Sequence, residues 1–165
     1  MKKFKGFTLI ELIVVIAIIG VLTAILIPAL MGWVTKSKIS TCNSNASEVF
    51  NQLSVCMSDL ETSGKSVGTV TVTYENGVWS GIDDADIKKE ITKISTVLSH
   101  TKRASWVAQI DDGVVKAVAY SEKNNGGIAG GFPVPCPRDA SYHLSADSIE
   151  DCLAAALGEK KWSEI

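Results

Sequence analysis

Residues 7–35 read FTLIELIVVIAIIGVLTAILIPALMGWVT, an apolar run with one charged side chain, the carboxylate of Glu11. Three lysines precede it, at positions 2, 3 and 5. A helix over residues 12–35 would cover roughly 36 Å, and the hydrocarbon core of a bilayer is about 30 Å thick. The run therefore predicts a membrane-spanning helix. An acid costs about 2.5–3.5 kcal/mol at the centre of such a helix and less near its end. Glu11 therefore either reaches water at the interface or has a specific partner.

Two ordinary explanations account for only part of this segment. A secretory signal has an apolar region of about 7–15 residues that ends at a small-residue cleavage site, and this run is longer. A plain N-terminal membrane anchor explains the run and the lysines, but it gives no role to Glu11 or to the Gly6–Phe7 junction.

The motif GFTLIEL, residues 6–12, resembles the class III signal of type IV prepilins and pseudopilins. The resemblance continues through VVIAIIG, residues 14–20, to Pro28. It implies that a prepilin peptidase cuts after Gly6 and methylates the new amino terminus on Phe7. It also implies that Glu11 pairs with the Phe7 amine of a neighbouring subunit during assembly.

The implied charge pair has a physical basis. An α-amino group has a pKa of about 7.7–8.0, so it is mostly cationic at neutral pH, and methylation keeps its charge. A buried charge whose partner is removed is strongly destabilising, so the pair would favour one subunit register. Before cleavage Phe7 has no free amine. We therefore expect processing to convert a membrane-stored precursor into a filament subunit.

The helix is expected to continue beyond the apolar run. Apolar residues recur at alternating spacings of three and four, at positions 39, 42, 46, 49, 53, 56 and 60. This stripe predicts an amphipathic helix that ends near Thr62, before Gly64, and packs on a globular head. A short coiled coil is the alternative. Gly20 and Pro28 are expected to make the first half flexible, through a kink or a melted stretch.

Four parts follow from this pattern: a leader (residues 1–6), a hydrophobic transmembrane or filament-core half-helix (7–35), an amphipathic half-helix (36–64) and a head (65–165). Asn76-Gly77 and Asp112-Gly113 predict two β-hairpins, and two short helices are expected, the first capped by Asp83 or Asp84. The fold class is α+β, with the long helix packed on a small antiparallel sheet. The expected strands are 67–74, 78–80, 104–111 and 114–120, the helices 87–98 and 148–157, and the loop 122–142.

Four cysteines fit an exported head in an oxidising environment. Cys42 and Cys56 lie on the same stripe about 21 Å apart, too far to bond to each other. Two pairings therefore remain open. Both helix cysteines could bond to Cys136 and Cys152, or Cys136 could bond to Cys152, as in many pilins, with two buried thiols left on the helix.

Composition and motifs argue against an enzyme. His100 and His143 are isolated, no short Cys-x-x-Cys pair indicates zinc, and we expect no cofactor. The aspartates at 83, 84 and 86 lack calcium-loop spacing and are better explained by helix capping. The formal charge of −2 becomes −5 without the three leader lysines, which opposes binding to nucleic acid.

The leading hypothesis is a structural subunit of a type IV pilus. Its expected partners are copies of itself, a prepilin peptidase, the pilus assembly machinery and, before assembly, the cytoplasmic membrane. One alternative is a pseudopilin of a type II secretion or DNA-uptake system. Another is a single-span adhesin that binds a surface or polysaccharide through an exposed tryptophan, for which Trp33, Trp79, Trp106 and Trp162 are the candidates.

Overall fold

The computed structural model describes residues 7–75, 77–97, 104–123, 127–138 and 149–165, with the backbone alone at 86 and 94–97. The expected leader with Gly6, the turn residue Asn76, and His100 and His143 lie outside the described residues. The chain divides into two compact units, Met1–Thr35 and Lys36–Ile165, which are described separately.

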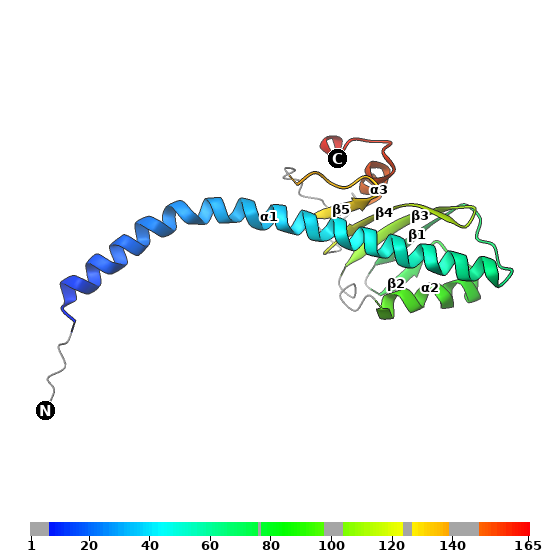
Figure 1. Ribbon diagram of the computed structural model, residues 1–165, viewed down its shortest axis with the longest axis horizontal. Helices are drawn as coiled ribbons and strands as arrows, with labels where there is room; N and C mark the ends of the chain where they lie inside the picture. The colour runs from blue at the N-terminus through cyan, green and yellow to red at the C-terminus, as the bar shows by residue number, and fades with distance from the viewer. Residues whose placement is uncertain (1–6, 76, 98–103, 124–126, 139–148) are drawn as a thin grey trace, which may run out of the picture. The chain divides into compact units, whose positions relative to one another are not determined.

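Helix α1, Leu9–Thr62, begins in the first unit and ends in the second (Figure 1). Its predicted end at Gly64 is confirmed. Gly64 has a φ of 75°, and the N–H of Lys65 donates to the carbonyl of Leu60 at 3.0 Å. This left-handed residue closes the last turn, as glycine commonly does after a helix.

The second unit contains one antiparallel sheet with the order β2-β1-β3-β4-β5. Both predicted hairpins are present. Gly77 has a φ of 81°, and Asp112 and Gly113 have φ values of 53° and 76°, which suits tight turns between strands. The strands are β1 (Val70–Glu75), β2 (Val78–Ser80), β3 (Ser105–Asp111), β4 (Val114–Ser121) and β5 (Ala129–Phe132).

Two predictions about strands need correction. β1 starts at Val70 and not at residue 67, because its partner β3 ends opposite it, where Val70 pairs with Ile110. The segment 122–142 is not all loop, because it contains β5. Its glycines look like loop signals, but packing requires them. A β-carbon on Gly130 would lie 2.4 Å from the Cys42 carbonyl carbon, and one on Gly131 would lie 2.6 Å from the Trp162 ring.

Both faces of the sheet are buried, because the side chains of each strand alternate between two cores. The first core contains the stripe of α1 from Cys42 to Leu60, Trp106 and Ala108 of β3, and Ile87 and Ile91 of α2 (Ala85–Val97). The second contains Val107 of β3 and the apolar side of α3 (Ile149–Leu157). The prediction that the amphipathic half of α1 packs on a head is confirmed. The position of α3 on the opposite face of the sheet was not predicted.

The first short helix has the predicted cap. The backbone N–H of Ile87 donates to Oδ1 of Asp84 at 3.0 Å, which identifies Asp84 as the cap. The second helix begins at Ile149 and ends before Gly158, whose φ is 82°.

The prediction of an adhesive tryptophan on the head is wrong for all three candidates there. Trp79 and Trp106 are 9% and 1% exposed and pack edge to face with ring centroids 5.2 Å apart. Trp162, in the short 3-10 helix Trp162–Glu164, is 5% exposed. Large aromatic side chains bury much area at small entropic cost, so a small core uses them first.

Candidate assembly site

Glu11 and Thr8 form a reciprocal cap at the start of α1. Oε2 of Glu11 accepts hydrogen bonds from the Thr8 backbone N–H at 2.8 Å and from the Thr8 hydroxyl at 2.6 Å. Oγ1 of Thr8 accepts from the Glu11 N–H at 3.3 Å. This is a capping box, in which two side chains satisfy the unpaired N–H groups of the first turn. This capping box was not predicted, although Thr-x-x-Glu is its sequence signature.

The capping box orients the Glu11 carboxylate and leaves some of its acceptor positions open. An ionised carboxylate has about four acceptor positions, and both hydrogen bonds from Thr8 reach one oxygen, Oε2. Glu11 is therefore held in place and can still accept from a cation. Phe7, whose amine is the expected partner of Glu11 in a neighbouring subunit, is 89% exposed.

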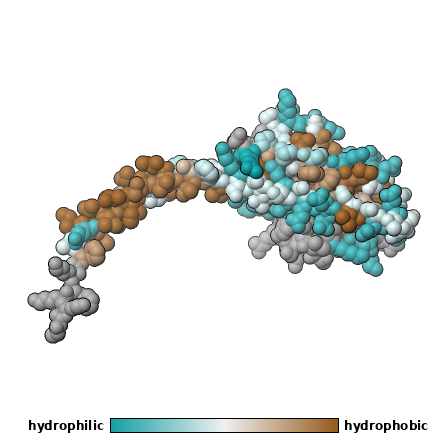
Figure 2. All heavy atoms as spheres, viewed as in Figure 1, coloured by the Kyte–Doolittle hydropathy of each residue, from teal (hydrophilic) through white to brown (hydrophobic). Residues whose placement is uncertain are grey.

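The rest of the first unit is an apolar helix without protein cover. Figure 2 shows its surface as almost continuously hydrophobic. Ile10, Ile25 and Met31 are 70%, 70% and 67% exposed. Among the described residues, α1 alone is long and apolar enough to cross a membrane. Such a surface requires lipid or apolar partners, because a soluble monomer rarely exposes an apolar patch larger than a few hundred Å².

Gly20 and Pro28 both lie inside α1, which is helical on either side of them. No melted stretch interrupts this part of the helix. Their contribution to flexibility stays a prediction.

Asn43 is the main polar link between α1 and the segment after β5. Its Oδ1 accepts from the N–H groups of Gly131 at 3.0 Å and Cys136 at 2.9 Å. Its Nδ2 donates to the Cys136 carbonyl at 2.8 Å. Sequence reasoning missed this clamp, since nothing near position 43 indicates which distant backbone it binds.

All four cysteines are buried free thiols. Burial is the main cause that raises the pKa of Cys42 and of Cys152 to about 12, and the nearby Cys136 raises both further. Burial alone raises the pKa of Cys136 to about 11. Cys136 thus acts electrostatically on two other cysteines, Cys42 of α1 and Cys152 of α3.

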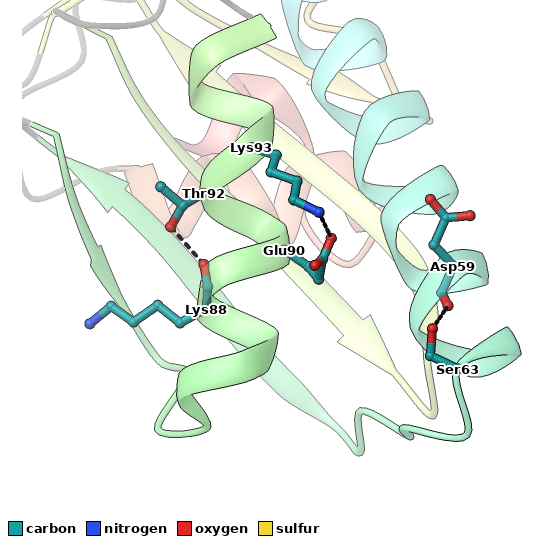
Figure 3. A network of polar contacts seen from close by, with 6 residues as sticks. All are labelled: Asp59, Ser63, Lys88, Glu90, Thr92 and Lys93. Atoms are coloured by element: carbon teal, nitrogen blue, oxygen red, sulfur yellow. Dashed lines mark hydrogen bonds and ion pairs between the residues drawn. The ribbon is translucent and has the colours of Figure 1, made fainter.

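Cys56 has different surroundings. Burial raises its pKa to about 11, and the charged groups that act on it are Glu90, Asp59 and Lys93. Figure 3 shows these residues where α2 lies beside the end of α1, with Glu90 paired to Lys93. The structure therefore does not bring Cys56 to Cys136 or Cys152, as a double staple would require.

No group of three or more His, Cys, Asp or Glu side chains within the described ranges could hold a metal ion. A groove of about 650 Å³ lies between α1 and the segment after β5, lined by Ser40, Ser44, Ser47 and Arg138 among others. It contains no nucleophile paired with a base.

The comparisons with known proteins bear on the N-terminal segment. A family model described as the prokaryotic N-terminal methylation motif matches residues 1–27. The N-terminal segment carries the type IV prepilin motif. The predicted resemblance to type IV prepilins is confirmed, and the matched curated proteins are fimbrial proteins.

The chain is 39% identical over 61 residues to the type IV major fimbrial protein FimA of Dichelobacter nodosus, which covers 37% of this chain and 39% of that protein. It is 42% identical over 76 residues to the fimbrial protein EcpC of Eikenella corrodens, covering 46% and 39%. It is 58% identical over 38 residues to the type IV major alpha-pilin of Moraxella bovis, covering 23% and 24%. The chain thus spans about two fifths or less of these relatives. No solved structure matches it.

Proposed function

We propose that this chain is a structural subunit of a type IV pilus. The proposal rests mainly on the properties of the first unit. It follows the methylation motif, exposes apolar side chains all round, and holds one oriented carboxylate at the start of its helix. An apolar surface of this kind needs lipid around a precursor and apolar helices of neighbouring subunits in a filament.

In this proposal a prepilin peptidase cuts after Gly6 and methylates Phe7. The precursor crosses the cytoplasmic membrane once, with the leader lysines on the cytoplasmic side. The assembly machinery then transfers the helix from lipid into the core of a surface filament, and the head faces outward. The named relatives support this reading, because they are fimbrial proteins and pilins.

Glu11 gives the transfer its specificity. The new amine on Phe7 of one subunit is the cation, and the carboxylate of Glu11 on the next is the anion. The capping box with Thr8 restricts the carboxylate rotamers before the amine arrives, which lowers the entropy lost on pairing.

The decisive experiment separates the charge of Glu11 from its capping role. Glu11→Gln keeps an acceptor for Thr8, since Gln also serves in capping boxes, but removes the charge. Thr8→Val removes the hydroxyl and keeps the charge. We expect Glu11→Gln to abolish surface filaments, and Thr8→Val to reduce their number, when sheared surface material is counted by electron microscopy.

Filaments of normal number and length from Glu11→Gln would refute the charge pair. Mass spectrometry of the mature N-terminus tests the processing step independently. Methylated Phe7 supports assembly, whereas an intact Met1 on the surface protein would indicate a static membrane anchor.

A further inference from the structure

Three of the four cysteines lie on segments of the second unit that pack against one another. Cys42 lies on α1, Cys136 follows β5, and Cys152 lies on α3. All three are at most 4% exposed.

The Asn43 clamp brings Cys136 to α1. Both the N–H and the carbonyl of Cys136 bond to the Asn43 side chain, at 2.9 and 2.8 Å. Asn43 is next to Cys42 in the chain, and the thiol of Cys42 donates to the carbonyl of Ile128 at 3.1 Å, just before β5. Cys42 and Cys136 therefore lie on adjoining segments, which these hydrogen bonds hold together.

The other neighbour of Cys136 is Cys152. The two belong to the same apolar core, and a negative charge on Cys136 raises the pKa of both Cys152 and Cys42. Cys56 belongs to neither neighbourhood, since its charged neighbours are on α2 and the end of α1.

We propose that Cys136 is a shared disulfide partner, which bonds either to Cys42 or to Cys152, while Cys56 stays a thiol. One sulfur forms one disulfide, so the two bonds exclude each other within a molecule. The Cys42–Cys136 bond links α1 to the segment after β5. The Cys136–Cys152 bond closes only the short segment between β5 and α3.

Each bond forms by thiol–disulfide exchange with a disulfide-bearing oxidant. The Cys136 thiolate attacks the oxidant and expels one thiolate, which gives a mixed disulfide. Cys42 or Cys152 then attacks Cys136 and releases the second thiolate. Two cysteine thiols lose two protons and two electrons, and the oxidant disulfide becomes two thiols. The remaining cysteine can exchange the two bonds by attacking Cys136 and expelling its partner.

The test uses the full chain in detergent, oxidised with oxidised glutathione, alkylated and digested without reductant. Trypsin alone leaves Cys42 and Cys56 on one peptide, because no lysine or arginine lies between Lys38 and Lys65. Additional cleavage after Glu48 separates them. We expect the wild type to give both the Cys42–Cys136 and the Cys136–Cys152 peptides, with Cys56 alkylated.

The variants decide between a shared and a dedicated partner. Cys152→Ala should move Cys136 entirely into the bond with Cys42, and Cys42→Ala should move it entirely into the bond with Cys152. Cys56→Ala is the matched control and should leave the ratio unchanged. Because thiolate is the nucleophile and these thiols are weak acids, the rate should rise about tenfold per pH unit between pH 7 and pH 9. An alkylated, unbonded Cys136 in Cys152→Ala overturns the proposal, as does any disulfide between Cys56 and another cysteine of the same subunit.

Discussion

Replacing Asn43 with Ala should destabilise the second unit more than any other single polar change on α1. The substitution leaves three backbone groups without their partner: the N–H groups of Gly131 and Cys136, and the carbonyl of Cys136. Each buried group left unpaired costs about 1–3 kcal/mol. The groove of about 650 Å³ beside Asn43 admits water, which recovers part of this loss. We therefore expect a loss of about 2–4 kcal/mol, against a total stability of about 5–15 kcal/mol.

The assay is urea unfolding of the full chain in detergent, followed by the fluorescence of the buried tryptophans. The matched control is Asn51→Ala, which changes an exposed asparagine on the same helix. Both variants gain the same helix propensity from Ala, so the difference between them isolates the clamp. A difference below about 0.5 kcal/mol, the usual range for surface substitutions, would refute the reasoning that Asn43 carries this contact.

Three further predictions use the same assay. Gly81→Ala should destabilise the sheet strongly, because Gly81 has a φ of 89° and a β-carbon there would lie 2.0 Å from the Thr71 carbonyl oxygen. The control Gly68→Ala should be near neutral, because Gly68 has open space around it. Equal losses of stability in the two variants would contradict the close approach at Gly81. Trp162→Ala should lower the free energy of unfolding by about 3–5 kcal/mol, since the ring is buried and its Nε1 donates to the Val134 carbonyl at 3.2 Å. A loss below about 1 kcal/mol would show that the last residues are not part of the core. In the presence of a reductant, the free energy of unfolding should fall as pH rises from about 8.5 towards 12. The reason is that burial raises the pKa values of the four thiols and of Tyr120 to about 11 or 12 in the folded chain, so the unfolded chain loses these protons first. A flat profile over this pH range would contradict the burial of these groups.

Most of the long helix could be predicted from local patterns in the sequence. The amphipathic stripe, the stop at Gly64 and both hairpins follow from period and turn chemistry, which act over a few residues. The position of β5 could not be found this way. Ala129-Gly130-Gly131-Phe132 has little strand propensity, and it forms a strand because only glycine lets the backbone approach Cys42 and the Trp162 ring.

The candidate assembly site was likewise predictable only in part. Glu11 stands out because one acid in an apolar run is costly, so its position alone marks it. Its link to Thr8 was also present in the sequence as a capping-box pattern. The Asn43 clamp joins residues about 90 positions apart, and no local rule predicts such a pair.

The segment after β5 also bears on how subunits could associate. Its Val134 N–H donates to the Ala156 carbonyl at 3.3 Å, and its Cys136 N–H donates to Asn43. The residues between and beside them, Pro133, Pro135 and Pro137, have no N–H at all. The segment from Pro133 to Pro137 therefore offers no unbonded N–H to an added strand, and β2, at the other edge of the sheet, is three residues long. Such features protect a sheet, because exposed strand edges pair with each other. In the proposed filament, the apolar half of α1 is the surface that drives assembly, and the charge of Glu11 sets its register.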